Sequence, residues 1–162
     1  MAVRARRSRS IILYGAVAGG LATGVMSAVM FGAKRAGLMG EMPPEKITSR
    51  FLDRIGWRNR GKRSQDALAS LAHVSFGAAA GSVYSALQRG IGLPGPPILA
   101  GALFGACVWF VSYQGWVPAL GIMPPPDKDR PGRPQAMLLA HLVYGATVGL
   151  LVERKANAKA SA

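Results

Sequence analysis

The 162-residue chain carries a formal net charge of +13, and 50% of its residues are hydrophobic. No charged residue occurs at positions 10–33, 67–88, 90–126 or 134–152. A helix needs about 20 apolar residues to cross the hydrocarbon core of a bilayer, and these runs lack the polar face of a soluble helix. The pattern excludes an ordinary soluble domain and predicts an all-α integral membrane protein with four transmembrane helices.

The basic residues gather in the segments that flank these runs, beginning with a basic N-terminus at residues 1–10. Anionic lipid headgroups attract such flanking charges. We therefore expect the lipid bilayer and its anionic headgroups as partners, and no nucleic acid. A homo-oligomer or an unknown membrane partner stays open.

Residues 11–33 form the first predicted transmembrane helix. It contains two overlapping GxxxG spacings, Gly15/Gly19 and Gly20/Gly24. Helices in lipid associate through close backbone approach at small residues, so we expect these glycines to pack against another helix.

The next segment begins with Met42-Pro43-Pro44, which predicts a rigid and extended exit from the membrane. In residues 47–63, Phe51, Leu52 and Ile55 share one helical face among several basic residues. This pattern favours a short amphipathic helix on the membrane surface. A solvated loop is the alternative.

Residues 67–88 form the second predicted helix, residues 97–117 the third and residues 135–152 the fourth. Cys107, the only cysteine, is expected to be a small buried thiol in the third helix. Residues 153–162 have the composition of a disordered tail. The glycines expected to pack these three helices are Gly77, Gly81, Gly101, Gly105, Gly145 and Gly149.

An internal repeat relates the two halves of the chain. Residues 71–85 and 139–153 share six positions, including His73/His141, the only two histidines. A shift of 81 residues places Gly20 and Gly24 on Gly101 and Gly105, and Met42-Pro43-Pro44 on Met123-Pro124-Pro125.

The repeat predicts two tandem helical hairpins, residues 11–88 and 97–152, related by a pseudo-two-fold axis along the membrane normal. The two histidines would then lie at equal depth. They would approach each other if the second and fourth helices met through their glycine faces. The orientation stays open, because the two longer loops carry 12 basic residues and the other flanks carry eight.

The segments MPPEKITSR, AHVSFGAAAGSVY, LGIMPP and HLVYGATVGLL resemble the YagU-like bacterial inner-membrane proteins of unknown function. The resemblance covers nearly the whole chain. It implies a small, multi-pass protein of the bacterial inner membrane with four helices, and it brings no catalytic residues.

His73 and His141 form the candidate functional pair, because polar side chains at membrane depth face a bundle interior or a cavity. Three hypotheses remain. Each imidazole could bond a neighbouring helix in a structural or envelope-stress protein, the pair could serve a proton-responsive or small-solute transporter or channel, or both could ligate a haem. Two histidines are too few ligands for a metal ion alone.

No sequence pattern indicates an enzyme. The chain has no nucleophile elbow, no phosphate-binding loop and no pair of carboxylates inside a predicted span. We therefore expect no catalytic residue, no metal site and no cofactor apart from the haem hypothesis.

Overall fold

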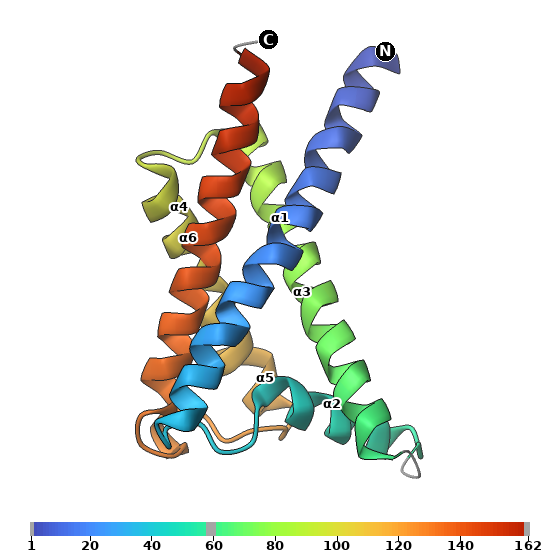
Figure 1. Ribbon diagram of the computed structural model, residues 1–162, viewed down its shortest axis with the longest axis vertical. Coiled ribbons are helices and arrows are strands. Elements are labelled where there is room, and N and C mark those ends of the chain that lie inside the picture. Colours follow the sequence, from blue (N-terminus) through green and yellow to red (C-terminus); the bar gives the residue numbers. More distant parts are fainter. Residues whose placement is uncertain (1, 58–60, 161–162) are drawn as a thin grey trace.

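The computed structural model describes residues 2–57 and 61–160, with side chains described for residues 10–57 and 61–154. Over these residues the protein is all-helical (Figure 1). The long helices are α1 (Ala2–Arg35), α3 (Lys62–Ile91), α4 (Pro97–Trp109) and α6 (Arg133–Ala160). A π-helix, η1 (Phe110–Trp116), and the short α5 (Val117–Ala119) continue α4, while α2 (Pro43–Arg54) and the 3₁₀ turn η2 (Pro126–Lys128) lie in the loops.

Four helical segments of the described chain are long and apolar enough to cross a membrane: Ser10–Arg35, Lys62–Ile91, Pro97–Ala119 and Arg133–Arg154. Their outer faces are apolar, as Leu13, Leu71 and Leu103 show with 64–68% of their surface exposed. Continuous apolar faces of this kind are unfavourable in water and suit contact with lipid chains. Helix length and these apolar faces indicate a multi-pass membrane protein, and the four candidate spans agree with the four predicted ones.

The helices extend beyond the bounds taken from the charge-free runs. α1 includes residues 2–10, and α6 continues to Ala160, although a disordered tail was expected from residue 153. The segment ERKANAKA consists largely of alanine and charged residues with high helix propensity. This propensity explains why the helix continues beyond the last apolar residue. The expected disordered tail is thus helical as far as Ala160, and residues 161–162 lie outside the described residues.

The Met-Pro-Pro segment is not an extended exit. Only Met42 is extended, with φ −71° and ψ 134°, and α2 begins directly at Pro43. Proline is well accommodated in the first turn of a helix, because its missing N–H would have no intrahelical partner there. The 12 residues of α2 thus run from the prolines into the basic segment, and α2 packs beside α3.

The long helices pack as two close pairs, α1 with α3 and α4 with α6, and α1 also packs along α6. Figure 1 shows both termini at one end of the bundle and α2 with the two longer loops at the other. We call these the terminal end and the loop end. Towards the loop end α3 diverges from α1 and α6, and α2 lies across the space between them (Figure 1).

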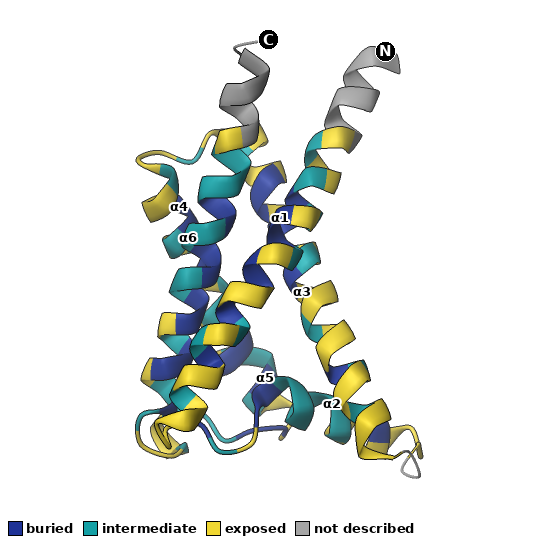
Figure 2. Cartoon of the chain, viewed as in Figure 1, coloured by how far each residue is buried: buried dark blue, intermediate teal, exposed yellow. Residues whose placement is uncertain are grey.

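The buried core lies where these helices meet, as Figure 2 shows by its dark stripes along their inner faces. Its residues are mainly methionine, tyrosine and alanine, including Met30 and Met39 at 0–1% exposure. Cys107 is exposed on the outer surface of α4, which corrects the expectation of a buried thiol. The position has no side chain of a neighbouring helix to cover it, because α4 turns its glycines and not this residue toward α6.

Candidate functional site

Glycines bring α1 and α3 into backbone contact around the middle of both helices. A Cβ atom added at Gly19 would overlap the carbonyl oxygen of Gly77, and one added at Gly81 would overlap that of Gly15. The backbones of the two helices therefore touch at a distance that only glycine permits. The contact runs over about two helical turns, from Gly15 against Ser85 to Thr23 against Gly77.

The α4–α6 pair has a contact of the same kind. A Cβ added at Gly101 would overlap the carbonyl oxygen of Gly145, and one added at Gly105 would overlap that of His141. Gly149 in turn lies against the carbonyl oxygen of Pro97. Each glycine face thus meets the preceding long helix.

The expected helix packing of the Gly20/Gly24 pair is corrected by these contacts. Gly24 is exposed, a Cβ there would meet no described atom within 4 Å, and one at Gly20 would meet only Val74 at an ordinary 3.8 Å. The glycine faces of α3 and α6 also do not meet each other, since each is occupied by α1 or α4. The two histidines are consequently not brought together through a glycine contact.

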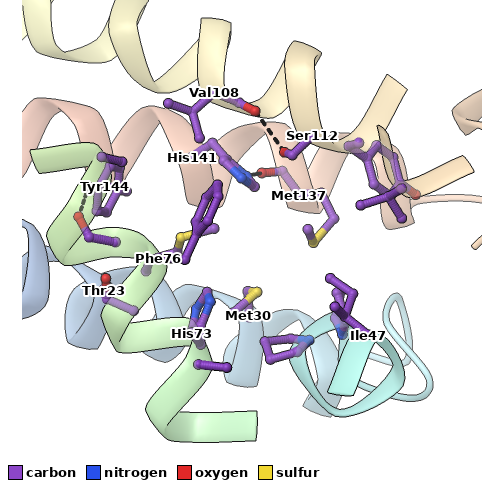
Figure 3. A pocket seen from close by; sticks show the side chains of 18 of the residues that line it. Thr23, Met30, Ile47, His73, Phe76, Val108, Ser112, Met137, His141 and Tyr144 are labelled. Carbon is purple, nitrogen blue, oxygen red and sulfur yellow. Dashed lines mark hydrogen bonds between the residues drawn. The ribbon is translucent and has the colours of Figure 1, made fainter. Parts of the chain in front are cut away.

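A cavity of about 250 Å³ occupies the space where α3 diverges from the other helices. Its walls come from α1, α2, α3, α4 with η1, and α6, so every long helix contributes. Both His73 and His141 line it, and Figure 3 shows them on opposite walls, from α3 and α6. The fold therefore brings the two predicted residues to one site by a different route from the expected one.

The two imidazoles differ in their surroundings. His141 is 6% exposed, and its Nδ1 lies 2.8 Å from the carbonyl oxygen of Met137 one turn earlier. Because a carbonyl oxygen only accepts hydrogen bonds, Nδ1 carries the proton and Nε2 is left as an acceptor. His73 is half-buried, and its buried Nε2 has no hydrogen-bond partner among the described residues.

Several other polar groups of the cavity wall are bonded to the protein. Thr23 donates to the carbonyl of Gly19 at 2.8 Å, and Ser112 donates to the carbonyl of Val108 at 2.7 Å. The hydroxyl of Tyr144 donates to the carbonyl of Gly77 at 2.6 Å, which connects α6 to α3 across the terminal side of the cavity. The imidazoles are thus the titratable nitrogen groups of this wall, and Nε2 of His73 is a buried atom left without a hydrogen-bond partner among the described residues.

The Met-Pro-Pro segments lie at the loop end of the cavity. Pro43 and Pro44 line it at the start of α2, and Met123 lines it from the second loop. Pro124 and Pro125 precede the η2 turn and are half-buried. The first segment therefore contributes to the cavity through its prolines and the second through its methionine.

A buried ion pair next to the cavity was not found from the sequence. Arg133 is 6% exposed and binds Asp129 at 3.0 Å, while its Nη2 donates to the carbonyl of Met39 at 2.6 Å. Tyr113, which lines the cavity, donates its hydroxyl to the same carboxylate. This network ties the loop after α1 to the loop before α6 and to η1.

The π-helix η1 is the second feature that the sequence did not reveal. π-helical turns are rare in proteins, and those that occur are frequently found at functional sites. Ser112, Tyr113 and Trp116 of η1 all line the cavity. A charge-free run gives no signal for this local change of helical period, whereas the spacing Asp129-x₃-Arg133 could have indicated an i, i+4 ion pair.

Residues 10–162 match a family of unknown function, DUF6789. The chain belongs to this family. The match spans all four transmembrane segments of the DUF6789 protein and gives no support to the YagU-like resemblance in particular. The comparisons with curated proteins and with solved structures found no match.

A haem does not fit between the two histidines of this DUF6789 protein. Pockets for drug-sized ligands span about 300–1,000 Å³, and a cavity of about 250 Å³ is below that range. A macrocycle would require the helices to separate. Among the described residues, no group of three or more histidine, cysteine, aspartate or glutamate side chains could hold a metal ion.

Proposed function

We propose that this protein binds a small ligand inside the bilayer, in the cavity between its helices, with His73 and His141 as the polar contacts. The observation that carries the proposal is the cavity of about 250 Å³ lined by both histidines. A buried polar atom without a partner calls for an explanation, and a bound water or ion is one of those known from other proteins. The unpartnered Nε2 of His73 supports such a ligand.

The proposal includes the location and the architecture. We place the protein in the bacterial inner membrane, with anionic lipid headgroups around its basic flanks, and we regard it as a binding protein with no enzymatic activity. We further propose a tandem repeat of two hairpins. The matching backbone contacts, Gly19 with Gly77 in one pair and Gly101 with Gly145 in the other, support the repeat.

If one hairpin moved against the other and opened the cavity to the two sides of the membrane in turn, the protein would act as a transporter or channel. Beside the cavity, the bond from Tyr144 to the carbonyl of Gly77 joins the two hairpins and would have to break or shift in such a movement. A purely structural role in the envelope is the second candidate. It is favoured by His141, whose Nδ1 is already satisfied within its own helix.

Thiol labelling tests whether the cavity admits small molecules. In a Cys107→Ser background, we would introduce one cysteine at Ala69, which is 2% exposed and lines the cavity, or at Ala22, which is 0% exposed and lies outside it. A small methanethiosulfonate should modify Ala69→Cys much faster than Ala22→Cys in vesicles. Equal, slow modification of both would refute a binding cavity and leave the structural role.

A further inference from the structure

We infer that the cavity is a binding site for a soft monovalent metal cation, with copper(I) as the natural ion and silver(I) as its stable substitute. The inference rests on the proposed function, because it names the ligand of the same cavity. Two histidines alone would be too few ligands. The fold adds thioether sulfurs, which the chain distributes over α1, the second loop and α6.

The methionines supply the additional ligands. Six of the seven methionines belong to the buried core cluster, and four of these six line the cavity. The four that line the cavity are Met26, Met30, Met123 and Met137. Thioether sulfur is a soft ligand that selects copper(I) over hard ions.

The side chains converge from two walls. Figure 3 shows His141 and Met137 on the wall formed by α6, and His73 and Met30 on the facing wall, with the sulfurs of both methionines directed into the space between. Met137 and His141 are four residues apart and so share one face of α6. Methionine has a flexible, unbranched side chain, so its sulfur can adjust its position to a bound ion.

His141 has the hydrogen bond that metal-binding histidines usually have. Such a histidine donates its other ring N–H to a carbonyl or carboxylate, which fixes the tautomer and the ring orientation. Nδ1 of His141 makes this bond to the carbonyl oxygen of Met137 at 2.8 Å. Its Nε2 lone pair is therefore available to a metal ion.

His73 provides the second nitrogen. Its Nε2 is buried and has no hydrogen-bond partner among the described residues, although the ring lines the same cavity. A nitrogen lone pair in this position is unfavourable unless something binds it. A metal ion shared with His141 would satisfy both rings at once.

The charge of the site favours a monovalent ion. No carboxylate is among the residues that line the cavity, and hard cations such as Mg²⁺ and Ca²⁺ require oxygen ligands. Burying charge in an apolar interior is unfavourable, so neutral sulfur and nitrogen ligands suit a single positive charge better than a double one.

Methionine also fills irregular gaps in apolar cores without any role in binding. Met39 separates the two explanations. It is fully buried in the same core cluster as Met30 but does not line the cavity. Leucine conserves the volume of methionine, so a leucine at either position removes a sulfur and preserves the packing.

The experiment measures silver(I) and copper(I) binding by the full-length protein in detergent, in a Cys107→Ser background that removes the only thiol. Copper(I) affinity would be obtained by competition with a chromophoric copper(I) chelator. Met30→Leu, Met137→Leu and His73→Gln are compared with Met39→Leu as the matched control, each checked for a monodisperse elution profile.

We expect one ion per chain, and at least a tenfold loss of affinity for each cavity variant. Loss of an outer partner of a metal site alone typically costs about 10–100-fold. Met39→Leu should bind like the parent, and zinc(II) should bind far more weakly than silver(I). X-ray absorption of the copper(I) form should show both sulfur and nitrogen neighbours.

Two results would overturn the inference. One is the absence of stoichiometric binding, and the other is binding that survives in all cavity variants, which would place the ion elsewhere. If Ala69→Cys is still labelled in either case, the cavity stands as a binding site for another ligand. If Ala69→Cys is not labelled either, the proposed function fails together with the inference.

Discussion

The glycine contact between α4 and α6 leads to a quantitative prediction for Gly145→Ala. The new Cβ would lie 2.8 Å from the carbonyl carbon of Gly101 and 2.8 Å from the amide nitrogen of Gly105. Non-bonded heavy atoms prefer a separation of about 3.5–4.0 Å. Because both neighbours are backbone atoms and cannot rotate away, the two helices must move apart by about 1 Å.

A radial gap of about 0.5–1 Å forfeits a quarter to a half of the dispersion energy between facing atoms. Overpacking of this kind costs about 1–3 kcal/mol. Alanine has a helix propensity about 1 kcal/mol better than that of glycine. Where the unfolded chain is not helical, this gain stabilises the folded state and offsets part of the packing loss. We therefore expect Gly145→Ala to lower the free energy of unfolding by about 1–2 kcal/mol.

The assay is reversible unfolding in mixed micelles with increasing sodium dodecyl sulfate, followed by the helical circular dichroism signal. Gly81→Ala should cost a similar amount, since its Cβ would lie 2.7 Å from the Cα of Gly19. Gly24→Ala is the matched control, because no described atom lies within 4 Å of its Cβ. Equal unfolding curves for Gly145→Ala and Gly24→Ala would refute the backbone contact.

Three further predictions concern the ion pair and the histidines, and each uses the same unfolding assay. Arg133→Gln should lower the free energy of unfolding by about 3–5 kcal/mol, because it leaves the buried carboxylate of Asp129 without its ion pair. Arg130→Gln, at an exposed position, should change it little, and equal effects of the two variants would contradict the prediction. Tyr113→Phe should cost about 1.5–3 kcal/mol, the usual contribution of a hydrogen bond to a charged group, and no change would show that the bond contributes nothing. His73→Leu should stabilise the ligand-free protein, since an unsatisfied buried polar group costs about 1–3 kcal/mol. His141→Leu should destabilise it by about 0.5–1.5 kcal/mol, because it removes the hydrogen bond to Met137. Identical shifts would instead support equivalence of the two histidines.

The four spans and their order could be predicted from the sequence, because the absence of charge over about 20 residues is a local property that the bilayer itself requires. The helix ends could not. α6 continues to Ala160 through residues whose helix propensity is high and whose polarity is also high. Hydropathy indicates where a helix leaves the membrane. The helix itself can end at a later residue.

The packing face of α1 was ambiguous for a geometric reason. Gly15/Gly19 and Gly20/Gly24 have the same spacing and differ by five residues, which places them about 140° apart around a helix of 3.6 residues per turn. Only the position of α3 decides between these two faces, and α3 packs on Gly15 and Gly19. The repeat alignment pairs Gly20 with Gly101. By its backbone contact, however, Gly101 corresponds to Gly19, one residue earlier.

The cavity was beyond sequence reasoning because its lining is assembled from all the long helices, α2 and the second loop. The two histidines gave a signal, since each is a rare polar residue in a charge-free run. Met30 and Met137 gave none, because an isolated methionine in an apolar helix has the properties of any core residue. Their common position becomes visible only when α1 and α6 are packed together.

The glycine contact also explains why the cavity exists. Backbone contact at Gly19 and Gly77 holds α1 and α3 together around the middle of both helices, and helices that meet through small residues often cross at a marked angle. Two straight helices that cross at one point must diverge away from it, and α3 does diverge towards the loop end (Figure 1). The resulting space is closed at its base by Pro43 and Pro44 of α2, and His73 lies on its wall one turn beyond Gly77. The spacing His73-x₃-Gly77 thus places a polar ring directly beside the opening that its own glycine produces, so the same short motif sets both the crossing and the chemistry of the site.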